Sequence, residues 1–459
     1  MPPATIATLP PAAWAAATFG AATLGDPRRT RRLVATAGAI AAAPGASLPS
    51  QLADPGALKA TYRLLGNEAL SFDAILAPHA ARTRAAASGG TVLLVQDTTE
   101  LDFTAHPATA DLAPIGTGGG RGFHLQTVLA VTPADRVPLG VVAAEAWTRT
   151  PAPPAETRAQ RARRDRESDV WGRLARVVGR PPADTTWVHV ADRGADCYTF
   201  YTACRAVGAA FLVRVVQNRR VVRADGTAGR LVDVVRQLPP ATTRPLAVPA
   251  RGDRPARDTE VAVAWTPLTL EPPRPRGAGA PAAAPIPVWA VRVWEPAPPA
   301  GADPVAWLLL TTVPVVTVAD AWARVDWYTC RWLIEELHKG LKSGCRIEQV
   351  QLRERAGIER LLAVLLPVAV RLLGLRAASR QTPHAPVAHL ADAATVRLVA
   401  ALARQPEADT VARFAAQVAR LGGYQDRRGD GPPGWQTLWR GWQKVETAWA
   451  TLAALDLPG

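Results

Sequence analysis

Three acidic residues stand where carboxylates could bind divalent metal ions. Asp97 follows the apolar run TVLLVQ, Asp192 follows the apolar run TTWVHVA, and Glu335 lies in the charged segment YTCRWLIEELHKGLKSG. We expect both aspartates at strand ends, where a carboxylate is costly to place unless it is solvated, paired or metal-bound. Two Mg²⁺ ions with oxygen ligands can stabilise the attacking and leaving oxygens of a displacement at phosphorus. The three acids therefore predict a two-metal Mg²⁺ site for phosphoryl transfer, with Mn²⁺ as the alternative because the same ligands suit it.

The segment around Glu335 predicts one amphipathic helix. At about 100° per residue, one narrow polar face collects Tyr328, Arg331, Glu335 and Lys342. The opposite face is apolar and consists of Leu333, Ile334, Leu337 and Leu341. A charged face turned to solvent is the simpler explanation of this pattern. Because two further acids follow buried strands, we favour a face that holds a phosphate beside the third metal-binding acid.

The chain carries an excess of positive charge. Lys and Arg number 53 against 39 Asp and Glu in 459 residues, a formal charge of +14. This excess favours a polyanionic partner, with nucleic acid ahead of an acidic membrane surface. Nearly all of it is arginine, so high-GC codon bias is an alternative cause. The predicted helix start DPRRTRR contributes four arginines, which either contact phosphate or form a solvated face: Arg28, Arg29, Arg31 and Arg32.

The spacing of apolar residues predicts the elements that position these groups. Residues 14–87 are typical of helices, with Asp26-Pro27 as a cap and first-turn pair. After Gly89, apolar runs alternate with helix-compatible segments such as 158–178, which predicts an α/β domain with a central sheet. Residues 211–310 are short and strand-like around the Pro/Ala-rich stretch 271–288, which indicates a β-rich insertion. From Thr317 the chain is again helical and ends in a stripe of tryptophans, typical of a core or of helix pairing.

Cysteine usage and hydropathy indicate a reducing, aqueous compartment. Four cysteines without a CxxC pair predict neither a disulfide framework nor a zinc site. The start MPPATIATLPPAAW has no leader pattern, and the run LLAVLLPVAV is about half the length that a bilayer span needs. We therefore expect a soluble, cytoplasmic protein with no membrane partner.

The acids and the charged face together resemble a known family. Tyr328, Arg331, Glu335 and Lys342 reproduce the Y-x2-R-x3-E-x6-K signature of the insertion-sequence-four group of DDE transposases. The stretch ADRGAD around Asp192 is similar to that group's DREAD-type segment, and QDTTELDF resembles its first-aspartate strand. Further similarity lies in LGDPRRTRRL, in WLLLT and in RLGGYQDRRGDGPPGWQTLWRGW, so the resemblance covers nearly the full chain.

This resemblance implies a ribonuclease-H-like catalytic core, with a mixed central sheet flanked by helices and the acids Asp97, Asp192 and Glu335 as Mg²⁺ ligands. The implied domains are a helical DNA-binding domain at 1–88, the core at 89–375 with its insertion at about 211–310, and a helical dimerisation domain at 376–459. The implied activity is cut-and-paste transposition in a bacterial cell by a homodimer bound to transposon ends and target DNA. Nicking, a hairpin intermediate and joining of the 3′-hydroxyl proceed without an organic cofactor.

The resemblance also assigns DNA contacts. Tyr328, Arg331 and Lys342 would grip phosphates, and Trp307 matches an aromatic residue that stacks on a flipped base, which returns part of the cost of extracting it. The weaker DNA-contact candidates are Arg193, Arg214, Arg28, Arg29 and Arg32. In the DREAD-type segment Gly194 replaces the glutamate. Two other functions stay open: a catalytically silent DNA-binding inhibitor of transposition, and a sequence-tolerant metal-dependent nuclease.

Overall fold

A computed structural model describes residues 9–149, 153, 155–157, 160, 166–248, 256–273, 283–301, 303–427 and 433–455. The chain divides into two compact units. Unit 1 comprises Met1–Ala87, Thr98–Arg149 and Leu333–Gly459, and unit 2 comprises Ser88–Asp97 and Thr150–Trp332. The strand β1 (Gly90–Asp102) contributes its first part to unit 2 and its last part to unit 1. These divisions differ from the three predicted domains, whose boundaries remain predictions.

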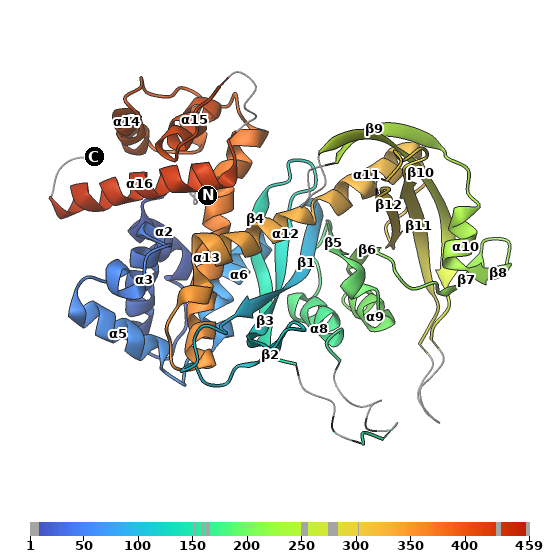
Figure 1. Cartoon of the computed structure of the whole chain (residues 1–459), viewed down its shortest axis with the longest axis horizontal. Helices are drawn as coiled ribbons and strands as arrows, with labels where there is room; N and C mark the ends of the chain where they lie inside the picture. The colour runs from blue at the N-terminus through green and yellow to red at the C-terminus, as the bar shows by residue number, and fades with distance from the viewer. Residues whose placement is uncertain are drawn as a thin grey trace. The chain divides into compact units, whose positions relative to one another are not determined.

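The N-terminal part of unit 1 is helical, as predicted (Figure 1). Its helices are α2 (Pro11–Phe19), α3 (Pro27–Ala42), α4 (Leu48–Gln51), α5 (Pro55–Leu65) and α6 (Phe72–Ala86). Polar side chains cap the starts of α3 to α6 by accepting from first-turn amides, namely Asp26, Ser47, Asp54 and Ser71. Such caps satisfy amides that lack an intrahelical partner, and proline in the first turn loses no hydrogen bond there. The predicted cap at Asp26 is confirmed.

The middle of unit 1 joins an antiparallel sheet to a long buried helix. β2 (Ala113–Ile115) and β4 (Pro138–Trp147) both pair with β3 (Gly120–Val131), which is buried along nearly its whole length. Both α6 and α13 (Arg355–Gln381) pack on β4. The apolar run from Leu361 is thus part of a helix longer than the sequence suggested, long and apolar enough to cross a membrane by length and composition alone. Because 78% of its apolar window is buried inside the protein, it has the character of a core helix.

The C-terminal part of unit 1 contains α14 (Ala393–Ala403), α15 (Val411–Leu421) and α16 (Trp435–Ala454). Trp435, Trp439 and Trp442 of the predicted stripe are buried, so this face of α16 belongs to the core. Its carboxylate Glu446 is buried and pairs with Arg371 of α13 at 2.5 Å. Arg371 also donates to the carbonyl oxygen of Leu9, so one guanidinium links α13, α16 and the chain's N-terminal part.

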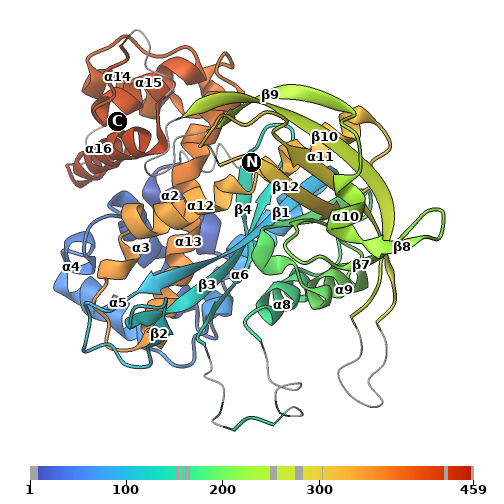
Figure 2. The same cartoon turned by 45° about the vertical axis from the view of Figure 1, so that its right-hand side comes forward.

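Unit 2 is a mixed sheet with helices packed on it, in agreement with the predicted α/β class (Figure 2). β1, β5 (Thr185–Ala191) and β6 (Ala210–Arg214) are parallel. β12 (Ala306–Thr311), β11 (Ile286–Trp294) and β10 (Arg257–Leu270) follow in antiparallel order. The remaining strands, β7 (Arg220–Arg223), β8 (Ala228–Arg230) and β9 (Thr242–Val248), extend the β10 side, and α10 (Leu231–Arg236) follows β8.

The helices of unit 2 cover the parallel strands. α8 (Asp169–Val178) pairs with α9 (Tyr198–Ala206), which packs on β6, while α11 (Val318–Thr329) packs on β5, β6, β10 and β11. Residues 158, 159 and 161–165 of the predicted helical segment 158–178 and residues 274–282 of the Pro/Ala-rich stretch lie outside the described residues. The extent of the predicted insertion remains a prediction.

Candidate functional site

Asp97 and Asp192 stand at the same level of two neighbouring parallel strands in unit 2. The pairing of β1 with β5 ends at Val95↔Val190, and each acid follows two positions beyond this pair. Neighbouring strands lie about 4.8 Å apart, so the two carboxylates rise from adjacent positions. Asp192 directly follows β5, as predicted, whereas Asp97 lies inside β1, which continues to Asp102. The prediction that Asp97 ends its strand is therefore wrong: polar residues continue the extended backbone where the buried run stops.

A guanidinium group neutralises Asp97. Arg331 Nη1 lies 3.2 Å from Asp97 Oδ2, and the two side chains are 17% and 18% exposed. The Asp192 carboxylate accepts the backbone amide of Gly194 at 2.8 Å and so caps the short 3-10 helix η1 (Arg193–Ala195). A cation thus already sits at one of the two acids, and Asp192 keeps acceptor capacity beyond its capping bond.

Four of the predicted DNA-contact residues gather beside these acids in unit 2, namely Trp307, Tyr328, Arg214 and Arg331. The rings of Trp307 and Tyr328 have centroids 5.5 Å apart. Burial raises the pKa of the Tyr328 phenol, against the opposing effect of Arg331 and Arg214, and Asp192 also acts to raise it. Arg214, whose own pKa is lowered by burial, donates to the carbonyl oxygen of Ala306 at 3.1 Å. The cluster therefore combines an aromatic pair with two cations next to a carboxylate.

The charged segment is not one helix. α11 ends at Thr329, α12 (Trp332–Lys339) begins after a break at Cys330 and Arg331, and a π-helical turn, η2 (Gly340–Gly344), follows. The prediction of one uninterrupted helix is therefore wrong, and the shared polar face of Tyr328, Arg331, Glu335 and Lys342 remains a prediction. Of the predicted apolar face, Ile334, Leu337 and Leu341 are buried, while Leu333 is half-buried.

Glu335 and Lys342 belong to unit 1, whereas Asp97 and Asp192 belong to unit 2. Glu335 is half-buried on α12. Lys342 Nζ lies 3.3 Å from Glu348 Oε1, and Glu348 also accepts the amide of Asp102 at 3.0 Å. The assignment of Glu335 as the third metal ligand and of Lys342 as a phosphate clamp remains a prediction.

The remaining arginine candidates are surface or half-buried groups. Arg193 is exposed, directly after Asp192. Arg28 pairs with Asp26 at 3.0 Å, and Arg29 donates to the carbonyl oxygen of Leu24 at 3.0 Å. Arg32 is half-buried on α3. Cations at a helix start are unfavourable to the helix dipole, and the Asp26 carboxylate offsets this for Arg28.

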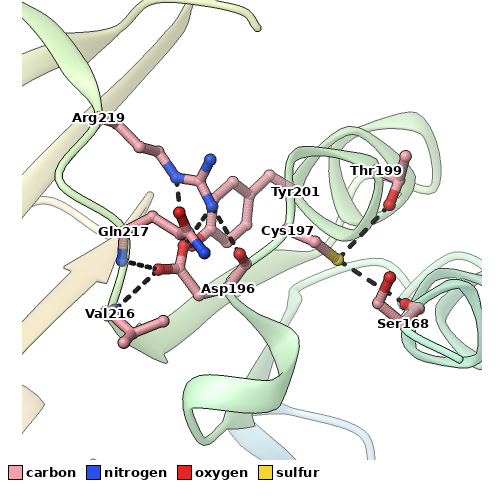
Figure 3. Close-up of polar contacts among 8 residues, drawn as sticks. All are labelled: Ser168, Asp196, Cys197, Thr199, Tyr201, Val216, Gln217 and Arg219. Atoms are coloured by element: carbon pink, nitrogen blue, oxygen red, sulfur yellow. Dashed lines mark hydrogen bonds and ion pairs between the residues drawn. The ribbon is translucent and has the colours of Figure 1, made fainter.

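Sequence reasoning missed Asp196, the second acid of ADRGAD. Its buried side chain accepts hydrogen bonds from Tyr201, Arg219 and the amides of Val216 and Gln217 (Figure 3). The only local signal was an acid flanked by alanine and cysteine after a buried strand. Its partners come from a separate loop, which no local pattern reveals.

The donor set suits a hard divalent cation in part. Within the described residues no three His, Cys, Asp or Glu side chains gather closely enough to hold a metal ion. Asp97 and Asp192 nevertheless supply carboxylate oxygens from adjacent strands, and Arg331 already places positive charge at one of them. Oxygen ligands of this kind fit Mg²⁺ or Mn²⁺.

Two family models match parts of this chain. Residues 11–70 match a transposase DNA-binding model, and residues 102–370 match a transposase DDE domain model. The first covers α2 to α5 and the arginine-rich start of α3; the second contains Asp192 and Glu335 and begins just after Asp97. Among solved structures, a piggyBac transposase synaptic complex with hairpin DNA is similar, at 8% identity and a TM-score of 0.32 over 81% of this chain. The chain spans 55% of the length of that transposase chain. The DDE domain model alone matches more than half of the residues of the present chain, so this chain belongs to the transposase DDE domain family.

Proposed function

We propose that this protein is a cut-and-paste DNA transposase of the insertion-sequence-four group, with the transposon-five transposase as a similar member. The observation that carries the proposal is the placement of Asp97 and Asp192 at one level of adjacent parallel strands, beside Arg331, Arg214 and Tyr328. Acids next to cations that can bind phosphate, in a chain of this family, support phosphoryl transfer on DNA. Transposon terminal repeats and target DNA are the proposed substrates.

The proposed roles follow from side-chain chemistry. Asp97, Asp192 and Glu335 would hold Mg²⁺, which when bound activates water and stabilises the oxygens of an in-line displacement. Arg331 and Arg214 neutralise phosphate charge, and a bidentate guanidinium also orients the phosphate. The raised pKa of Tyr328 keeps its phenol protonated, so that it can donate to a phosphate oxygen. Trp307 offers a ring on which an unpaired base can stack.

The complete reaction is proposed as nicking at each transposon end, attack of the new 3′-hydroxyl on the opposite strand to form a hairpin, reopening of the hairpin, and joining to target DNA. A homodimer would hold the two ends, with contacts from the C-terminal helices. The proposed setting is the bacterial cytoplasm.

Product analysis on DNA ends tests this function. A labelled fragment that carries the element's own terminal repeats is incubated with the full-length protein and Mg²⁺ or EDTA, and nicked, hairpin and joined products are resolved. We expect Mg²⁺-dependent hairpin and joined products confined to the terminal repeats. Tight binding without cleavage would favour the silent inhibitor instead, and cleavage of any DNA without joining would favour the nuclease.

A further inference from the structure

Asp196 is the buried centre of a hydrogen-bond network in unit 2 (Figure 3). Its side chain is 0% exposed. Oδ2 accepts from the backbone amides of Val216 at 2.8 Å and Gln217 at 2.7 Å. Oδ1 accepts from the Tyr201 hydroxyl at 2.6 Å and from Arg219 Nη2 at 2.6 Å and Nε at 3.2 Å. One loop, residues 216–219, and one helix, α9, therefore supply all the donors to this single carboxylate.

This carboxylate is saturated. An ionised carboxylate offers about four lone-pair positions, and the donors from Tyr201, Arg219, Val216 and Gln217 occupy them. Arg219 balances the buried charge, and burial raises the pKa of Tyr201 well above its usual value, so its hydroxyl stays a donor. Asp196 therefore has no lone pair left for a metal ion. Its contribution is to hold the neighbouring backbone segments, residues 192–196 and 215–217.

On one side, the network fixes the turn that presents Asp192. The Asp192 carboxylate accepts from Gly194, its carbonyl oxygen accepts from Ala195 at 3.2 Å, and the Asp196 amide donates to Arg193 at 3.2 Å. These bonds close residues 192–196 into a short rigid turn. Arg219 Nη2 also donates to the carbonyl oxygen of Asp196 at 2.5 Å, so both the backbone and the side chain at the far end of the turn are held.

On the other side, the network fixes the exit of β6. Val216 and Gln217 follow closely after Arg214, the last residue of β6. The intervening residue, Val215, donates to the carbonyl oxygen of Leu308 at 2.8 Å, so this exit is also tied to β12. The same carboxylate thus holds the backbone next to a candidate metal ligand and the backbone next to a candidate phosphate contact.

We propose that Asp196 is a positioning residue that sets Asp192 and Arg214 relative to each other, and this inference rests on the proposed function of those two residues. Supporting groups that orient metal ligands commonly change metal affinity or activity by about 10- to 100-fold when they are removed. Here the support is transmitted through the rigid turn 192–196 and through the loop 215–217.

The test compares Asp196→Asn with a matched control, Glu295→Gln. Glu295 is another buried carboxylate of unit 2, 1% exposed, directly after β11. It accepts from Arg257 and Thr259 of β10 and from the Val305 amide directly before β12. An asparagine at 196 places an NH₂ group either against the two backbone amides or against Arg219 and Tyr201, so either orientation breaks the network. Tyr201→Phe is the milder second variant, because it removes one donor and keeps the ring.

Three readouts are taken on the full-length protein: hydrogen exchange of the 194–195 and 216–217 amides, Mn²⁺ binding followed by electron paramagnetic resonance, and the Mg²⁺ concentration for half-maximal nicking. We expect Asp196→Asn to expose both amide pairs and to raise the half-maximal Mg²⁺ concentration about tenfold, with weaker Mn²⁺ binding. Tyr201→Phe should shift all three in the same direction by less. Glu295→Gln should lower the thermal midpoint yet leave all three readouts within about twofold of wild type.

Unchanged protection of residues 194–195 in Asp196→Asn, or an equal metal shift in Glu295→Gln, would overturn the positioning role. If Asp196→Asn does not fold, the same two comparisons are made with Tyr201→Phe: the protection of residues 194–195, and the metal shift relative to Glu295→Gln. Absence of nicking by the wild-type protein would instead overturn the proposed function. The exchange readout needs neither metal nor DNA, so it then still decides whether Asp196 holds the two segments.

Discussion

Arg331 holds a guanidinium nitrogen 3.2 Å from the Asp97 carboxylate, so the strand acid is charge-balanced before any substrate binds. A phosphate that binds Arg331 or a metal ion that binds Asp97 would have to replace the contact between these two side chains. We expect Arg331→Ala to reduce nicking at least tenfold, because the phosphate loses a bidentate cation. The partly buried pair should contribute only about 1 kcal/mol to stability. Initial nicking rates and thermal unfolding of the same preparation check this, with Arg180→Ala as the control because Arg180 is an exposed arginine of unit 2 outside the candidate site. A wild-type rate in Arg331→Ala would remove this residue from the site.

Loss of any one of the three candidate acids should abolish nicking. Asp97→Ala, Asp192→Ala and Glu335→Ala each remove carboxylate oxygens that a hard cation needs, while the cations proposed to contact DNA remain. We expect products below detection and DNA affinity within a few-fold of wild type in an anisotropy assay. Glu336→Gln is the control for Glu335, since Glu336 pairs with Arg376. Clear nicking by one of the three variants would contradict that acid's assignment.

Two glycines allow α15 and α16 to cross closely. A Cβ at Gly441 would lie 1.7 Å from the carbonyl oxygen of Val418, and one at Gly422 would lie 1.8 Å from that of Thr437. Gly441→Ala must therefore push the helices apart, and we expect a loss of about 3 kcal/mol or more in the free energy of unfolding. Gly434→Ala, where a Cβ meets nothing within 4 Å, should change it by less than about 0.5 kcal/mol. Chemical denaturation compares the free energies of unfolding of Gly441→Ala and Gly434→Ala. Equal values would show that α15 and α16 can move apart at little cost.

The buried pair Arg371–Glu446 should show strong coupling. Both side chains are nearly inaccessible, at 2% and 1% exposed. Glu446→Leu leaves a buried guanidinium unpaired, so we expect a loss of about 3–5 kcal/mol in the free energy of unfolding. The double variant Arg371→Met/Glu446→Leu should recover much of this loss, because no isolated charge remains. A double variant as unstable as the single one would show that the pair supplies more than charge balance.

Glu295 gives unit 2 an acid-sensitive contact. Its pKa is lowered to about 2, chiefly by the hydrogen bonds from Arg257. A carboxyl group whose pKa is depressed on folding adds stability above its unfolded pKa, about 4.5, and loses it as pH falls through its folded pKa. The thermal midpoint of wild type should therefore drop from pH 5 to pH 2 more steeply than that of Glu295→Gln. Parallel midpoint curves for the two proteins would exclude this contribution.

Local signals in the sequence predict the helical N-terminal part and the buried runs of the strands β1 and β5. Asp26-Pro27 begins α3 as expected because a cap depends only on residues within one turn. The break at Cys330 and Arg331 was not predictable in this way, since the apolar period runs on through it. The change from apolar to polar side chains predicts a strand end at Asp97, although the backbone stays extended to Asp102.

The candidate site was predictable only to the level of residue types. Asp192 after its strand and the cations Arg214 and Arg331 were identified in advance, and the structure gathers them with Tyr328. The network around Asp196 was not, because residues 216–219 reach it only through the tertiary fold. Contacts of that kind depend on packing between segments, which neither periodicity nor turn chemistry encodes.

The division of the chain also sets an order of events on the ribosome. All of unit 2 has been synthesised once Trp332 is added, whereas unit 1 needs its last stretch, Leu333–Gly459. Until α16 is synthesised, Arg371 cannot form its ion pair with Glu446. The guanidinium that also donates to the carbonyl oxygen of Leu9 is then unpaired with α16. Segments generally fold as units during synthesis, in the order in which they are made. The nascent chain therefore contains all residues of unit 2 while the N-terminal helices that match a DNA-binding model still lack Leu333–Gly459 of their own unit.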